Sequence, residues 1–243
     1  MLVREARGVM SLTLSASMTC MDPLNLGRTV AELDAEGLAV YHLDVCDGVF
    51  APTFLLYPSL LPWLRQATDS RLDVHLYCVH PSLYIDEFIE KGAHSIVVQL
   101  EAEDSFQELI PRIVSRGIRA GLGILPGSKV PGSLAAVLPL LSMVVANTVG
   151  PAYAGQSYDP RGLETIRAVR GMCESTGVAV EIAVDGAVQE ERLADFFGAG
   201  ANHLVLGTSS VFARGADWPA RFRSFRAAAE ELYRELAPRG GRG

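Results

Sequence analysis

Short apolar runs alternate with amphipathic stretches of helical length along nearly the whole chain. We count eight such pairs, a pattern that indicates parallel strands joined by helices. The expected strands are residues 10–17, 39–46, 72–78, 95–100, 120–125, 143–148, 178–185 and 203–207. The expected helices are residues 24–35, 59–68, 83–91, 105–116, 133–138, 161–175 and 190–198, then a short turn of helix at 209–212 and a longer helix at 220–236. The sequence therefore predicts an α/β protein with a (β/α)8 barrel.

A doubly wound open sheet is the alternative for such an alternation. It is less well supported because Ser15-Ala16-Ser17-Met18-Thr19 follows the first expected strand, where a dinucleotide-binding fold would carry its glycine-rich loop. The chain has 243 residues, 49% of them hydrophobic, which suits one barrel domain over residues 1–243. We expect the tail, residues 238–243, to be disordered.

Composition excludes several function classes. The net charge is −7 and no basic run is present, which argues against a nucleic-acid partner. No apolar stretch approaches the roughly 18 residues of a membrane span, and no signal-peptide pattern follows the charged N-terminus. The four cysteines are scattered, as expected for reduced thiols. We therefore expect a cytoplasmic protein that binds neither nucleic acid nor membrane.

Two histidines and two aspartates stand near the C-terminal ends of expected strands. His42 and Asp44 lie two residues apart and so share one strand face, while His75 and Asp185 come near the ends of two other strands. In a (β/α)8 barrel, the C-terminal ends of the strands carry the catalytic groups. Neutral imidazoles and carboxylates together suit a divalent ion such as Zn²⁺, with Fe²⁺, Mn²⁺ or Co²⁺ as possible alternatives.

Small residues dominate the loops after the sixth, seventh and eighth expected strands, at residues 150–156, 185–187 and 207–209. Small side chains let backbone N–H groups approach an anion, and a short helix after the last strand would add a partial positive charge. Barrels often bind phosphate at these loops. The pattern favours a phosphorylated substrate.

Several motifs resemble the ribulose-phosphate 3-epimerase family over nearly the whole chain. They are His42-Leu43-Asp44-Val45-Cys46-Asp47-Gly48-Val49-Phe50-Ala51-Pro52, Asp73-Val74-His75-Leu76, Leu100-Glu101-Ala102, Gly155-Gln156, Val184-Asp185-Gly186 and Ala199-Gly200-Ala201-Asn202. Three stretches are closer to the branch that acts on allulose 6-phosphate: Cys20-Met21-Asp22, Tyr153-Ala154-Gly155-Gln156 and Gly207-Thr208-Ser209.

The resemblance implies a ketose-phosphate 3-epimerase and assigns roles to particular residues. His42, Asp44, His75 and Asp185 would hold one divalent metal ion, and Asp44 and Asp185 would also be the acid/base pair. The implied substrate contacts are Ser17, His75, Ala152, Tyr153, Ala154, Gly155, Gly186, Ala187, Gly207 and Thr208. Two carboxylates can remove a proton beside a ketone from one face and return one to the other through an enediolate. No organic cofactor is needed, and family analogy suggests a homo-oligomer.

Three positions depart from the family. Cys46, Tyr77 and Asn147 stand where the family usually has methionines, and strand alternation predicts that all three border the site. They replace soft apolar side chains with a thiol, a phenol and an amide. We expect the metal and the catalytic aspartates to be kept while substrate preference differs.

Two other functions stay open from the residues alone. A metal-dependent sugar-phosphate aldolase or lyase needs only the metal and one base. A Schiff-base aldolase is disfavoured because Lys91 and Lys129 are the only lysines and neither ends an expected strand. The lysine of the related Asp-x-Lys-x-x-Asp barrels is also missing from residues 43–47. A non-catalytic sugar-phosphate-binding protein is the second alternative.

Overall fold

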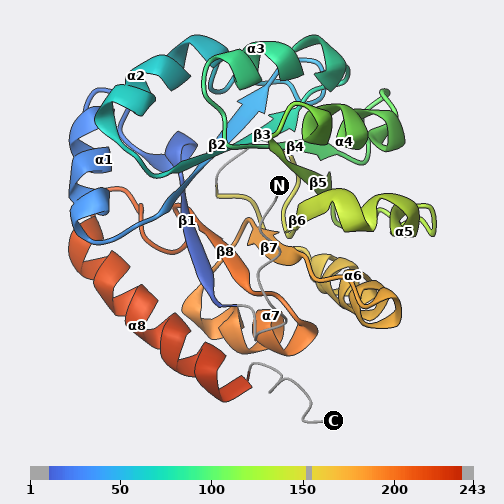
Figure 1. The fold of residues 1–243 in the computed structure, drawn as a ribbon. Helices are drawn as coiled ribbons and strands as arrows, with labels where there is room; N and C mark the ends of the chain where they lie inside the picture. The colour runs from blue at the N-terminus through green and yellow to red at the C-terminus, as the bar shows by residue number, and fades with distance from the viewer. Residues whose placement is uncertain (1–10, 152–154, 237–243) are drawn as a thin grey trace.

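Eight parallel strands close into a barrel, in which each strand pairs with the next and β8 returns to β1. The computed structural model describes residues 11–151 and 155–236. The strands are β1 (Thr13–Ser17), β2 (Val40–Cys46), β3 (Arg71–Tyr77), β4 (Ser95–Gln99), β5 (Arg119–Ile124), β6 (Leu141–Asn147), β7 (Glu181–Asp185) and β8 (His203–Leu206). Figure 1 shows the strands at the centre with the helices around them. The predicted (β/α)8 barrel is confirmed, and the open sheet is excluded.

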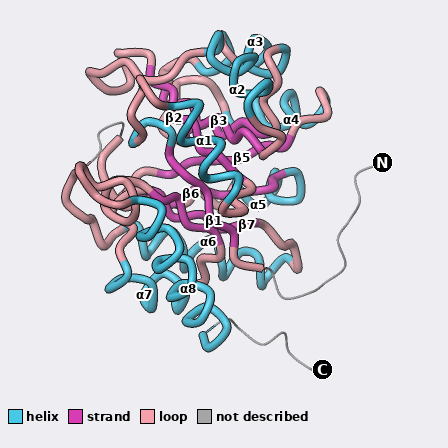
Figure 2. The backbone as a smooth tube through the Cα atoms, turned by 90° about the vertical axis from the view of Figure 1, so that its left-hand side faces the viewer, coloured by secondary structure: helices cyan, strands magenta, loops and turns pink. Residues whose placement is uncertain are grey.

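A layer of helices encloses the barrel, as Figure 2 shows from a second direction. These are α1 (Leu26–Ala35), α2 (Leu61–Ala67), α3 (Ile85–Glu90), α4 (Phe106–Ser115), α5 (Leu134–Val137), α6 (Gly162–Thr176), α7 (Leu193–Ala199) and α8 (Trp218–Leu236). Within the described ranges, no helix is both long and apolar enough to span a membrane.

The bounds of the strands and helices differ from the sequence-based expectation by up to three residues. The seventh strand begins at Glu181 and not at residue 178. The short turn of helix expected at 209–212 is observed as a turn, in which the N–H groups of Ser210, Val211 and Phe212 all donate to the carbonyl of Gly207, at 3.2, 3.0 and 3.0 Å. A helix would need successive carbonyls as acceptors. The expected disordered tail, 238–243, lies outside the described residues.

Side-chain alternation along the strands separates two environments. On β7, Ile182 and Val184 point outward into the main apolar core between strands and helices. Ala183 points inward, where it packs with Val97, Met143 and Val145 in a small apolar layer inside the barrel. This inner layer separates two polar ends of the barrel.

The lower end, where the strands begin, holds a partly buried charge network that we call the floor cluster: Arg71, Asp73, Arg119, Glu181 and His203. The Glu181 carboxylate lies 2.7 Å from Arg119, 3.4 Å from Arg71 and 3.1 Å from Nδ1 of His203. Arg71 also pairs with Asp73 at 3.1 Å. Burial raises the pKa of Glu181, but its hydrogen bond and ion pairs outweigh that effect and lower the pKa to about 2.

Candidate active site

Four side chains converge at the other end of the barrel interior, where the strands finish. His42 and Asp44 come from β2, His75 from β3 and Asp185 from β7. Nε2 of His42 lies 3.2 Å from Nδ1 of His75 and 3.2 Å from Oδ1 of Asp44. Both of these ring nitrogens lie 3.9 Å from Oδ2 of Asp185. The four residues can each present one ligand atom within 4.8 Å of the others.

This donor set fits a divalent metal ion. Both imidazoles are fully buried, and Oδ1 of Asp44 is a buried oxygen without a hydrogen-bond donor. Two nitrogen and two carboxylate oxygen donors match the ligand types of Zn²⁺ and related ions. Nδ1 of His42 and Nε2 of His75, the ring atoms on the far side, also have no hydrogen-bond partner in the described chain.

The charges of the cluster shift the pKa values of the two carboxylates in opposite directions. Burial lowers the pKa of His42, but the adjacent Asp44 outweighs it and raises the pKa to about 9. Burial, and then the charge of His42, lowers the pKa of His75 to about 3. Burial raises the pKa of Asp44, yet the charge of the adjacent His42 leaves it below its ordinary value. Burial and the charge of Asp44 raise the pKa of Asp185 to about 6. Such a separation is typical of a general base and a general acid in one site.

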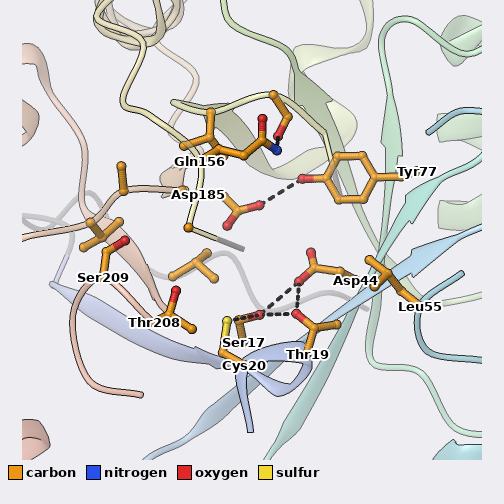
Figure 3. Close-up of a pocket in the computed structure, with 18 residues that line it drawn as sticks. Ser17, Thr19, Cys20, Asp44, Leu55, Tyr77, Gln156, Asp185, Thr208 and Ser209 are labelled. Carbon is orange, nitrogen blue, oxygen red and sulfur yellow. Dashed lines mark hydrogen bonds between the residues drawn. The ribbon is translucent and has the colours of Figure 1, made fainter. Parts of the chain in front are cut away.

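Side-chain hydroxyl groups donate to both carboxylates (Figure 3). Ser17, the last residue of β1, and Thr19, two residues later, donate to Oδ2 of Asp44 at 3.0 and 3.1 Å. Tyr77 donates to Oδ2 of Asp185 at 2.9 Å. Burial raises the pKa of Tyr77 well above its ordinary value, and the Asp185 charge raises it further, so the phenol keeps its proton and remains a donor.

A cavity opens above these groups. Counting its open mouth, it encloses about 600 Å³. It is lined by Ser17, Thr19, Cys20, Asp44, Leu55, Tyr77, Val149, Gly150, Gly155, Gln156, Asp185, Gly186, Ala187, Val188, Val205, Gly207, Thr208 and Ser209. The cavity therefore joins the carboxylates to the small-residue loops.

The turn after β7 forms part of the small-residue end. Gly186 and Ala187 both have positive φ, +100° and +45°. That conformation is uncommon for a residue with a side chain and is found mainly where the backbone has a special task. Within the described chain, the N–H groups of Gly186 and Ala187 donate to no other group. Both are available to a bound anion.

Some predicted site residues lie elsewhere. Ala152, Tyr153 and Ala154 fall outside the described residues. Asn147 is buried behind Asp185 and does not line the cavity. Cys46 does not line it either: its thiol donates to the carbonyl of Ala51 at 3.5 Å and packs beneath the loop that follows β2. The loop covers this strand end, which side-chain alternation alone does not reveal.

Two polar residues escaped the sequence reasoning. Thr19 follows the predicted Ser17 by two positions. That spacing places two side chains on the same face of a strand, but β1 ends at Ser17, so strand alternation does not predict the position of Thr19. Gln99 ends β4 and is fully buried, and its Nε2 donates to Asn147 at 3.0 Å. A polar residue at the C-terminal end of an apolar strand was the available signal for Gln99.

Comparison with known proteins agrees with this geometry. Residues 13–212 match the model of the ribulose-phosphate 3 epimerase family. The chain belongs to the ribulose-phosphate 3-epimerase family. The match runs from the start of β1 to the turn after β8, so it includes every strand that supplies a site residue.

Family relatives are similar over most of their length. The ribulose-phosphate 3-epimerase of Treponema pallidum is 33% identical over 82% of this chain and 91% of its own. That of Bacillus subtilis is 32% identical with the same coverage. Among solved structures, phosphoribosyl anthranilate isomerase from Thermus thermophilus superposes with a TM-score of 0.63 at 13% identity, over 91% of this chain and 100% of that one. This last likeness concerns the fold alone.

Proposed function

We propose that the protein is an isomerase that inverts the configuration at C3 of a ketose phosphate. One observation carries the proposal: Asp44 and Asp185 enter a single cavity from different strands, and the same cavity ends in small-residue loops (Figure 3). Two buried imidazoles lie beside these carboxylates. Membership of the epimerase family supports it.

The proposed chemistry uses the two carboxylates in turn. One carboxylate removes the C3 proton, and the electron pair of the C–H bond moves into an enediolate with the C2 carbonyl. The other carboxylate donates a proton to the opposite face of C3, and the roles reverse in the reverse reaction. Each such group typically contributes about 10²–10⁴-fold to the rate.

His42, Asp44, His75 and Asp185 would hold one divalent metal ion. When bound there, the ion would supply Lewis-acid stabilisation of the negative charge on the substrate oxygens. We propose Zn²⁺, because imidazole and carboxylate ligands suit it, with Fe²⁺, Mn²⁺ and Co²⁺ as the alternatives. Elemental analysis of the protein purified without chelators would identify the ion.

The phosphate group would bind at the opposite end of the cavity. The N–H groups of Gly186 and Ala187 and the hydroxyls of Thr208 and Ser209 are the proposed donors. Tyr77 lines the cavity where the family resemblance implies a methionine, and this replacement supports a shifted substrate preference. Equal activity on ribulose 5-phosphate and on every other ketose phosphate would contradict that shift.

Proton exchange at C3 tests the function directly. Metal-loaded protein is incubated in D₂O with ribulose 5-phosphate, xylulose 5-phosphate and allulose 6-phosphate, and the C3 signal is followed by NMR. We expect deuterium at C3 together with the epimer, and Asp185→Asn should abolish formation of the epimer. An absence of exchange with all of these substrates would refute the proposal and favour an aldolase, a lyase or a sugar-phosphate-binding protein.

Location and assembly remain predictions. We expect a cytoplasmic homo-oligomer. Size-exclusion chromatography with light scattering would test the assembly, and cell fractionation the location.

A further inference from the structure

Tyr77 connects two of the four residues of the metal cluster. Its ring stacks on that of His75, with centroids 4.2 Å apart and planes 29° apart. Its hydroxyl donates to Oδ2 of Asp185 at 2.9 Å, across the barrel from β3 to β7. One buried side chain thus contacts neighbours on two strands that are not adjacent in the barrel.

Asn147 supplies the second donor to the same oxygen. Its Nδ2 lies 3.1 Å from Oδ2 of Asp185 and 2.7 Å from the hydroxyl of Tyr77. Asn147 is opposite Asp185 in the register of β6 and β7. Gln99 donates to Oδ1 of Asn147 at 3.0 Å. Because that oxygen faces Gln99, the amide nitrogen of Asn147 must face Asp185.

The two carboxylates are therefore held by unlike partners. The donors to Asp44 are Ser17 and Thr19, small hydroxyls on the cavity wall that can turn toward a substrate. The donors to Asp185 are nearly or fully buried, with 3% of Tyr77 and 1% of Asn147 exposed. Oδ1 of Asp185 has no hydrogen bond within the described part of the chain, while both donors occupy Oδ2.

We propose that Tyr77 and Asn147 are positioning residues that fix the orientation of the Asp185 carboxylate, so that its free oxygen faces C3 of the substrate. This inference rests on the proposed function. Proton transfer on the Asp185 side then depends on these donors, whereas transfer on the Asp44 side does not.

Loosening Asp185 should uncouple proton exchange from inversion. When Asp44 removes the C3 proton, the electron pair enters the enediolate, and the proton on Asp44 exchanges with solvent deuterium. If Asp185 is displaced, Asp44 returns a deuteron to the original face and regenerates the starting sugar with deuterium at C3. When Asp185 removes the proton, exchange and inversion slow together. The defect is therefore expected with one epimer of a pair and not with the other.

Tyr77→Phe tests this because it removes the hydroxyl and keeps the ring on His75. Both epimers of the pair that the wild-type protein interconverts are incubated separately in D₂O. We expect epimerisation to fall roughly 10- to 100-fold, the range for a lost hydrogen bond to a charged group and a small displacement of a reacting group. The ratio of deuterium in recovered substrate to deuterium in product should rise at least about fivefold, for one epimer only. Asn147→Leu should act in the same direction.

Tyr41→Phe is a matched control. Tyr41 is fully buried, and its hydroxyl also meets a carboxylate, Oδ1 of Asp34 at 2.8 Å, but it lies on the outer side of β2. Its loss should lower stability and leave the deuterium ratio unchanged. Elemental analysis should find the same metal content in both variants and in the wild-type protein.

The outcomes separate the two proposals. If Tyr77→Phe shows the wild-type ratio with both epimers, or loses its metal, the positioning role is overturned while the epimerase function stands. If the wild-type protein exchanges C3 of no substrate in the panel, the function fails and the positioning role falls with it. A raised ratio for one epimer, with metal retained, supports both.

Discussion

The floor cluster should make a measurable, pH-dependent contribution to stability through Glu181. In the folded protein its pKa falls from the ordinary value of 4.5 to about 2. The difference of about 2.5 between these values corresponds to about 3 kcal/mol, at about 1.36 kcal/mol per pKa unit. Glu181→Gln keeps the size of the side chain and removes its charge. We expect the free energy of unfolding to fall by about 3 kcal/mol at pH 7, and the melting temperature by about 6–12 °C.

The pH dependence identifies the cause. A depressed carboxyl pKa stabilises the folded state fully above about pH 4.5, and that stability is lost as the pH falls toward 2. The free energy of unfolding of the wild-type protein should therefore fall between about pH 4.5 and pH 2. That of Glu181→Gln should fall less, because the variant has no carboxylate at this position to protonate. Urea unfolding followed by circular dichroism at pH 7, 5, 4 and 3 gives the difference between the two proteins, which should shrink toward zero as the pH falls.

A constant difference between pH 7 and pH 3 would refute this reasoning and point to packing. So would a difference below about 1 kcal/mol at pH 7, since the ion pairs would then contribute no more than exposed ones do. Glu174→Gln is the control, because Glu174 is exposed on α6 and should change stability little at any pH. Activity of Glu181→Gln should persist below its melting temperature, because the floor cluster lies at the opposite end from the cavity.

Three further predictions concern the end of the barrel that holds the cavity. Ala187→Gly should raise the free energy of unfolding by about 1 kcal/mol, since Ala187 has a φ of +45°; an unchanged urea midpoint would contradict this. Gly123→Ala should weaken metal binding at least about tenfold in a calorimetric titration, because the added Cβ would lie 2.6 Å from both Gln99 Oε1 and His75 Nε2. Removal of the metal by a chelator should abolish C3 exchange and lower the melting temperature, and added Zn²⁺ should restore both; the stabilisation expected at a free metal concentration 100 times the dissociation constant is about 2.7 kcal/mol. Full exchange activity in verified metal-free protein would contradict the last prediction.

Regular alternation made the fold and the metal cluster accessible from sequence. Period-two alternation places His42 and Asp44 on the inner face of β2 whatever the loops do, and the closed barrel brings the strand ends together. The order of strands and helices follows from the same apolar periodicity. These features depend on the local apolar periodicity and on the closure of eight parallel strands into a barrel, and both can be inferred from the sequence.

Contacts across the barrel were not accessible in this way. Tyr77 and Asp185 are separated by 108 positions in the chain, and their hydrogen bond depends on the side-chain reach across the closed barrel. The covering of Cys46 by Ala51 depends on the path of an irregular loop.

The alternation on β7 has a consequence for the accuracy of folding. Glu181 and Asp185 share the inner face of this short strand, while Ile182 and Val184 share the outer one. A slip of one residue against β6 would drive both carboxylates into the apolar helix layer and turn the two aliphatic side chains toward the polar ends. This slip would bury an unpaired carboxylate near each end of the strand, and each burial would destabilise the misaligned state. The residues proposed for chemistry and for stability thus also act together to exclude misaligned barrels.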